Sequence, residues 1–208
     1  MKYDAIVVAG GVGKRAGLGY NKVFFVMPEG CTVLEKACSC FLKDADCQKL
    51  IVVCNEQLPF TATKLQLVAG GEERYDSVCN GLKACTAEYV LIHDAARPFL
   101  KEEDLAKLKA ALRDNEGALL AMKAIDTIKQ VKDGYVEKTL DRNYLYQVAT
   151  PQGFKRECLI TCYKQANLQG ITDDASVLEQ AGYRVKVVEC DRSNVKLTCN
   201  EDFTALCR

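Results

Sequence analysis

Short apolar runs without alternating polar residues are the feature that most constrains how this chain folds. They are rich in Val, Ile, Leu and Ala, and they stand at 5–9, 50–54, 65–68, 89–92, 118–122 and 185–188. A strand covered on one face alternates between apolar and polar residues, whereas a parallel strand covered on both faces is apolar throughout. We therefore predict that these runs are buried strands.

Helical patterns separate the runs, at 32–43, 74–84, 102–115, 156–167, 173–181 and 200–207. In 102–115, Leu105, Leu108 and Leu112 recur at helical spacing, acidic residues lead and basic residues follow. Strands that alternate with helices predict an α/β fold, a mostly parallel sheet with helices on both faces. The 208 residues suit one domain, 1–208.

One segment departs from this alternation. In DTIKQVKDGYVEKTL, residues 126–140, two extended runs flank Asp133-Gly134, which is a strong signal for a two-residue hairpin. An isolated hairpin is marginally stable in water. This one can lie on the sheet or pack against a second copy of the chain, and we favour the second copy.

Composition excludes several classes of protein. Basic and acidic residues balance at 28 each, so no net charge favours nucleic acid or a membrane surface. We see no signal peptide and no run long enough to span a membrane, and we expect a cytoplasmic protein. Twelve cysteines accompany one histidine, without a CxxC pair, which favours small buried thiols over disulfides or a zinc site.

The first strand ends in the glycine-rich loop VVAGGVGKRAG, residues 7–17. A P-loop requires Ser or Thr after Gly13-Lys14, where Arg15 stands, and a dinucleotide-binding loop requires one residue fewer between its glycines. A third interpretation is a nucleoside triphosphate loop in which Arg15 and Lys22 neutralise phosphates. The alternative without function is a plain strand–helix turn with solvated cations.

A second polar cluster, IHDAARPF, follows the strand at 89–92. Ligands of open α/β sheets bind at the carboxyl ends of strands, so Asp94 is expected to face the same crevice as the loop. Its carboxylate suits Mg²⁺, and Arg97 suits a phosphate. The structural alternative is an Asp94–Arg97 ion pair with Asp94 capping the next helix. We expect His93 to be structural.

The chain resembles the 2-C-methyl-D-erythritol 4-phosphate cytidylyltransferase family of the non-mevalonate isoprenoid pathway. The motifs run in family order from Ala9 to Thr198: AGGVGKR, NK, GGEERYDSV, HDAARP, DT, DRN, TPQ, ITDDAS and NVKLT. The resemblance implies a Rossmann-like nucleotidyltransferase fold with a protruding β-arm, at 125–149, that exchanges across a homodimer. It also implies CTP, a polyol phosphate and Mg²⁺.

The resemblance also assigns residues. It implies catalytic roles for Arg15, Lys22, Arg142 and Lys196. It places the nucleotide on Ala9, Gly10, Gly11, Gly13, Gly71, Glu72 and Ser77. It places the methylerythritol phosphate on Asp94, Arg97, Thr127, Arg142 and Thr150, with Asp94 also on the metal and Arg142 supplied by the partner's arm.

The implied reaction transfers CMP from CTP to 2-C-methyl-D-erythritol 4-phosphate, giving 4-diphosphocytidyl-2-C-methyl-D-erythritol and pyrophosphate. The nucleophile is a phosphate already largely dianionic at neutral pH, because its second pKa is about 6, so no general base is required. A ribitol 5-phosphate cytidylyltransferase is the nearest alternative. An NAD(P)-dependent oxidoreductase and a nonenzymatic nucleotide sensor are more distant ones.

Overall fold

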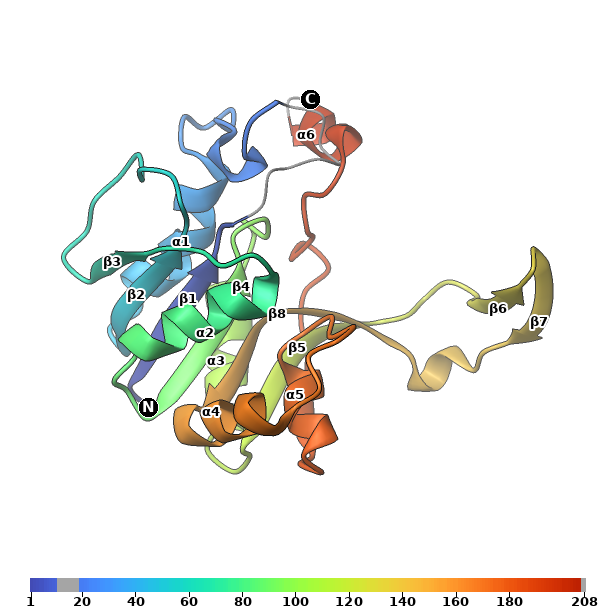
Figure 1. Ribbon diagram of the computed structural model, residues 1–208. Coiled ribbons are helices and arrows are strands. Elements are labelled where there is room, and N and C mark those ends of the chain that lie inside the picture. Colours follow the sequence, from blue (N-terminus) through green and yellow to red (C-terminus); the bar gives the residue numbers. More distant parts are fainter. Residues whose placement is uncertain (11–18, 207–208) are drawn as a thin grey trace.

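The computed structural model describes residues 1–10 and 19–206, and these form a central sheet covered by helices, with a two-stranded arm that projects from it (Figure 1). The strands are β1 Tyr3–Val8, β2 Cys47–Val53, β3 Leu65–Val68, β4 Tyr89–Asp94, β5 Gly117–Lys123, β6 Lys129–Lys132, β7 Tyr135–Thr139, β8 Tyr146–Lys155 and β9 Val185–Glu189. The helices are α1 Val33–Lys43, α2 Arg74–Ala84, α3 Glu102–Ala111, α4 Arg156–Gln165, α5 Ala175–Gln180 and α6 Asn200–Leu206, with 3₁₀ turns η1 Lys22–Phe24 and η2 Arg142–Tyr144.

The central sheet has the order β3-β2-β1-β4-β8-β5-β9. All neighbouring strands run parallel except that β8 is antiparallel to both β4 and β5. Helices α1 and α3 cover one face, and α2, α4 and α5 cover the other (Figure 1). The predicted α/β architecture is therefore confirmed.

Strand β1 shows why the apolar runs lack alternation. Every residue of β1 is buried. Ala5 and Val7 contact the layer that includes α1 and α3, while Ile6 and Val8 contact the opposite layer with α2. Each apolar side chain of the strand therefore enters one of two cores, and the buried Asp4 carboxylate accepts the backbone N–H groups of Lys49, Thr86 and Ala87, so no position faces water.

Strand β8 is the element that the sequence patterns did not predict. It contains Pro151 and Gly153, which argue against a central strand. Pro151 lies where the pairing between β5 and β8 shifts register, so a ladder bond is not required there. Gly153 is needed for packing, because a Cβ at that position would lie 2.4 Å from Leu112 Cδ1. The packing at Gly153 and the register shift at Pro151 both depend on neighbouring elements, which local patterns do not reveal.

The hairpin at Asp133-Gly134 is confirmed, with φ of 50° and 84° at these two residues. Its strands β6 and β7 are exposed throughout and do not pack on the central sheet (Figure 1). The alternative in which the hairpin covers the sheet is therefore wrong for this chain.

The described cysteines are free thiols, and Cys38, Cys40, Cys47, Cys54, Cys85 and Cys162 are buried, as predicted, while the other described cysteines are half-buried. Among the described helices, none combines the length and apolarity needed to cross a membrane.

Candidate active site

A cleft of about 470 Å³ opens at the carboxyl end of β4. Strand β1 lies beside β4 in parallel register, with Val8 opposite Asp94, so the residues that follow both strands meet at this edge. The cleft brings together four residues predicted from the sequence, Asp94, Arg97, Thr150 and Lys196. The remaining lining residues are Arg74, Val148, Ala149, Gln152, Thr172, Asp173, Ser176 and Glu179.

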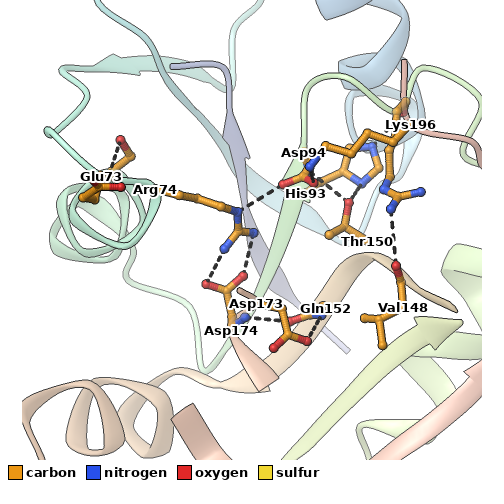
Figure 2. Close-up of polar contacts among 12 residues, drawn as sticks. Glu73, Arg74, His93, Asp94, Val148, Thr150, Gln152, Asp173, Asp174 and Lys196 are labelled. Atoms are coloured by element: carbon orange, nitrogen blue, oxygen red, sulfur yellow. Dashed lines mark hydrogen bonds and ion pairs between the residues drawn. The ribbon is translucent and has the colours of Figure 1, made fainter. Parts of the chain in front are cut away.

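Asp94 is the electrostatic centre of this cleft. One carboxylate oxygen accepts a hydrogen bond from Arg74 Nε at 3.2 Å, and the other accepts one from Lys196 Nζ at 2.7 Å (Figure 2). Burial alone would raise the pKa of Asp94, but the Arg74 and Lys196 charges hold it well below its usual range. The carboxylate is therefore ionised at neutral pH. The alternative of an Asp94–Arg97 ion pair is wrong, because the partners are Arg74 and Lys196.

Arg74 is itself held from behind by a fully buried carboxylate. Its Nη1 and Nη2 donate to the two oxygens of Asp174 at 3.1 and 2.8 Å (Figure 2). The Tyr163 hydroxyl donates to Asp174 Oδ1 at 2.6 Å, and the Asp174 N–H donates to Gln152 Oε1 at 3.0 Å. Burial alone would lower the pKa of Arg74, but Asp174 and Asp94 raise it above its ordinary value. Arg74 is thus a fixed positive charge beside Asp94.

His93 lies beneath the cleft and is structural, as predicted. It is fully buried, with Nε2 2.9 Å from the Arg97 carbonyl oxygen and Nδ1 3.0 Å from Thr150 Oγ1. A carbonyl only accepts, so Nε2 must donate to it, and neutral Nδ1 then accepts from the Thr150 hydroxyl. Thr150 Oγ1 is left to accept the Asp94 N–H at 3.0 Å. This chain of hydrogen bonds sets the backbone at Asp94.

Arg97 reaches the cleft from the turn after β4. Its Nη1 donates to the Asn194 carbonyl at 2.7 Å and its Nη2 to the Val148 carbonyl at 3.3 Å. Burial lowers the pKa of this guanidinium, and no partner among the described residues accepts from its buried Nε. Arg97 therefore presents a charge whose hydrogen bonds go to neutral carbonyls, which leaves it available to an anion.

The C-terminal segment brings the two predicted lysines to the same side of the sheet. Lys22 Nζ donates to the Leu197 carbonyl at 2.7 Å, next to Lys196 in the chain. The Leu197 N–H in turn donates to the Ala96 carbonyl at 2.8 Å, two residues after Asp94. Behind these contacts, Phe25 and Phe203 pack edge to face with ring centroids 5.1 Å apart. Residues about 175 positions apart are thereby joined at the cleft.

The residues predicted to hold the base gather at the start of α2. Ser77 is buried, and its hydroxyl accepts the Gly71 N–H at 3.0 Å. A Cβ at Gly10 would lie only 3.7 Å from this hydroxyl, so the turn after β1 adjoins the turn before α2. Gly71 must be glycine, because a Cβ there would lie 2.2 Å from Asp76 Cβ. Ala9 is buried and Glu72 is exposed.

Three predicted residues, Gly11, Gly13 and Arg15, lie outside the described residues. Two others, Thr127 and Arg142, belong to the arm, where both are exposed. Arg142 Nη1 donates to the Ile125 carbonyl within the arm. Neither Thr127 nor Arg142 is among the described residues that line the cleft of the same chain, and the arm projects away from the sheet (Figure 1).

The donor set at Asp94 suits Mg²⁺. This ion keeps several waters and takes few protein ligands, commonly one or two carboxylates together with substrate phosphates. Asp94 supplies one ionised carboxylate at the cleft, and the described residues contain no cluster of three or more metal-binding side chains that would form a complete cage. A phosphate-bearing substrate would have to supply the remaining ligands.

Sequence reasoning missed Arg74, Asp174 and Gln152. Arg74 stands inside GGEERYDSV and Asp174 inside ITDDAS, so both motifs were noted, but neither residue was assigned a role. Arg74 and Asp174 contact each other although they are 100 residues apart in the chain, which local patterns cannot show.

Comparisons with known proteins agree with this geometry. A family model described as 2-C-methyl-D-erythritol 4-phosphate cytidylyltransferase matches residues 3–206. The chain is 40% identical over 217 residues to the protein of that name from Geobacillus kaustophilus, covering 98% of this chain and 94% of the relative. It is 36% identical over 216 residues to the one from Bacillus licheniformis, covering 98% and 93%.

Solved structures agree as well. The Francisella tularensis 2-C-methyl-D-erythritol 4-phosphate cytidylyltransferase superposes with a TM-score of 0.85 at 29% identity, over 99% of this chain and 98% of that one. The 4-diphosphocytidyl-2C-methyl-D-erythritol synthase from Anaerococcus prevotii superposes with a TM-score of 0.84 at 31% identity, over 99% and 96%. The chain therefore belongs to the 2-C-methyl-D-erythritol 4-phosphate cytidylyltransferase family and is a nucleotidyltransferase.

Proposed function

We propose that the chain transfers CMP from CTP to 2-C-methyl-D-erythritol 4-phosphate in the cleft at Asp94. Family membership over nearly the whole chain supports this substrate over ribitol 5-phosphate. The observation that carries the placement is the set of cations that converge there, with Arg74 and Lys196 on Asp94 and Arg97 beside them. Such a site suits a reaction between two phosphate-bearing anions.

The chemical difficulty of this reaction is repulsion between the reactants. The attacking phosphate is largely dianionic at neutral pH, so it needs no base. His93 supports this, because it is fully buried below the cleft and burial lowers its pKa to about 4. Catalysis then consists of holding the attacking oxygen in line with the α-phosphorus and neutralising the charge on the α-phosphoryl oxygens.

Cationic side chains would supply that neutralisation. In our proposal Lys196, Lys22 and Arg15 contact the triphosphate, and Arg97 with Thr150 holds the polyol phosphate. Lys196 would exchange its ion pair with Asp94 for the phosphates of CTP. Asp94 would then hold Mg²⁺, which would supply further positive charge to the phosphates. Arg74 keeps the carboxylate in place during this exchange because Asp174 fixes it independently.

Ala9, Gly10, Gly11, Gly13, Gly71, Glu72 and Ser77 would line the nucleotide side. The contacts that bring Gly10 and Gly71 to Ser77 support a common pocket for the base and ribose. Gly71 and its neighbours lead into α2, and N–H groups at the start of a helix suit polar atoms of a nucleoside.

We propose that the chain is one domain, 1–208, and that its arm at 125–149 mediates a homodimer. The arm exposes apolar side chains, with Val131 56%, Val136 59% and Tyr135 80% exposed. Such exposure on a two-stranded ribbon supports packing against a second chain. Arg142 and Thr127 would reach the partner's cleft from there. A cytoplasmic location stays a prediction.

Product analysis with both polyol phosphates tests the activity. The purified chain is incubated with CTP, Mg²⁺ and equal amounts of 2-C-methyl-D-erythritol 4-phosphate and ribitol 5-phosphate, and the nucleotide products are identified by mass spectrometry. We expect 4-diphosphocytidyl-2-C-methyl-D-erythritol and pyrophosphate as the main products. A predominance of CDP-ribitol, or an absence of both products, would refute the proposal.

A further inference from the structure

A second groove lies on the sheet face covered by α2 and α4, apart from the cleft at Asp94. It has a volume of about 370 Å³ and runs between these two helices, which lie side by side in Figure 1. Its lining residues are Cys79, Leu82, Lys83, Arg156, Ile160, Tyr163 and Lys164. Among the described residues, none lines both this groove and the cleft. We call it the α2/α4 groove.

The groove has an apolar floor and a cationic rim. Leu82, Ile160 and the Tyr163 ring belong to the apolar cluster of this face. Lys83 and Lys164 are exposed, and in the described part of the chain neither forms an ion pair. Lys83 Nζ donates only to the neutral Asn80 side chain, at 3.1 Å. No carboxylate of the described residues lines the groove.

This combination selects a ligand by its chemistry. An apolar floor stabilises a hydrocarbon chain through burial of its surface. Lysines without acidic partners at the rim favour an anionic head group, and they disfavour a cationic one. The volume suits a short chain rather than a macromolecule. The complementary ligand is a small amphipathic anion, a hydrocarbon chain of a few carbons that ends in a phosphate or carboxylate.

Tyr163 connects this groove to the cleft. Its ring lines the groove, and its hydroxyl donates to Asp174 Oδ1 at 2.6 Å. Asp174 holds Arg74, and Arg74 contacts Asp94. A molecule that displaces the Tyr163 ring would weaken the hydrogen bond to Asp174 and loosen Arg74. The contacts thus form an unbroken path from the groove to the centre of the cleft.

We propose that the α2/α4 groove binds a small amphipathic anion and that the bound molecule lowers the activity of the cleft through Tyr163. The binding step is independent of the proposed function, whereas the effect on activity rests on it.

Calorimetry with the full chain tests the binding step, using octyl phosphate as the probe and saturating CTP with Mg²⁺ present to occupy the cleft. We expect saturable one-site binding, with affinity rising from butyl to octyl phosphate because longer chains bury more apolar surface. Octylamine and octanol should bind at least about tenfold more weakly. Equal binding of octylamine, or loss of octyl phosphate binding when CTP is added, would overturn the proposal.

Charge-removing variants locate the site. Lys83→Gln with Lys164→Gln should weaken octyl phosphate binding roughly tenfold, because the variant loses two exposed charge contacts to the anion. The matched control, Lys2→Gln with Lys107→Gln, makes the same charge change away from the groove and should leave binding unchanged. Equal loss in both double variants would indicate a nonspecific charge effect and overturn the assignment.

Tyr163→Phe tests the connection, because it keeps the ring and removes only the hydroxyl. In the wild-type chain, saturating octyl phosphate should lower the rate of cytidylyl transfer roughly fivefold, a typical coupling between two sites. In Tyr163→Phe, calorimetric binding should persist while this further loss of rate disappears. Binding that leaves the wild-type rate unchanged would refute the connection, and a chain that lacks transferase activity but still binds the probe would refute only the proposed function.

Discussion

His93 makes the stability of this protein depend on pH in a way that can be calculated. It is the only histidine in the chain, and burial lowers its pKa from 6.5 to about 4. Between these values the unfolded chain binds a proton that the folded chain does not bind. The free energy of unfolding must therefore rise as pH increases from about 4 to about 6.5, and stability is lost as pH falls through this range.

The structure explains the direction and sets the magnitude. Protonated His93 would have to donate from Nδ1 to Thr150 Oγ1, where it now accepts, and the buried ring would carry a charge beside Arg97. The difference between 6.5 and about 4 corresponds to roughly 3 kcal/mol, since each tenfold change in proton affinity is worth about 1.4 kcal/mol.

Urea unfolding measured by circular dichroism from pH 4.5 to 7.5, under reducing conditions, tests this calculation. His93→Gln should remove the contribution of the histidine to the pH dependence between pH 4.5 and 6.5, so that the wild-type curve rises more steeply than the variant curve, whereas acidic groups contribute equally to both proteins. Parallel curves for the two proteins would refute the reasoning. If His93→Gln does not fold, the NMR titration of the single histidine in wild type gives its pKa directly. A pKa above 6 would also refute the reasoning.

Three further predictions concern the cleft. Asp174→Asn should lower the free energy of unfolding by about 2–3 kcal/mol, because it removes one of the two carboxylates that pair with the Arg74 charge at a buried site. The neighbouring Asp173→Asn should lower it by less than about 1 kcal/mol. Equal losses for the two variants in urea unfolding would contradict this prediction. Lys196→Ala should lower kcat about 100-fold or more in a steady-state assay. Lys101→Ala, which removes a lysine from an exposed ion pair, should change kcat less than about twofold. A loss below about threefold for Lys196→Ala would argue against its catalytic role. If the arm supplies Arg142 to a partner, mixing inactive Arg142→Ala and Lys196→Ala chains should restore roughly a quarter of wild-type activity. Half of the dimers are then mixed, and each mixed dimer has one intact site out of two. Sedimentation that shows a fully active monomer would exclude the shared site.

Much of the fold follows from local patterns. Strands such as β1 and helices such as α2 were predicted within a few residues, because burial on both faces and helical spacing both leave a trace in a single segment. The arm was predicted from Asp133-Gly134, since a two-residue turn is a local property. Strand β8 was not predicted, because the places of Pro151 and Gly153 in it depend on neighbours that are distant in the chain.

The candidate site divides in the same way. Asp94 was selected from its position after a predicted strand and Lys196 from the family resemblance, and the structure joins them at 2.7 Å. Arg74 was left without a role, because its importance arises from Asp174, its partner across 100 positions. The structural alternative of an Asp94–Arg97 ion pair was wrong for a related reason. Closeness in sequence suggested it, but the turn after β4 directs the two side chains toward different partners.

The sequence by itself determined the strands other than β8, the helices, the hairpin and the chemical types of the groups at the sheet edge, because hydrophobic periodicity, turn residues and motif spacing act over a few residues. Only the tertiary structure decided which charges pair, that β8 lies in the centre of the sheet, and that the arm projects away from the cleft of its own chain. Those outcomes depend on packing and electrostatics between distant segments, and a side chain's partner there is set by three-dimensional distance and burial rather than by separation along the chain.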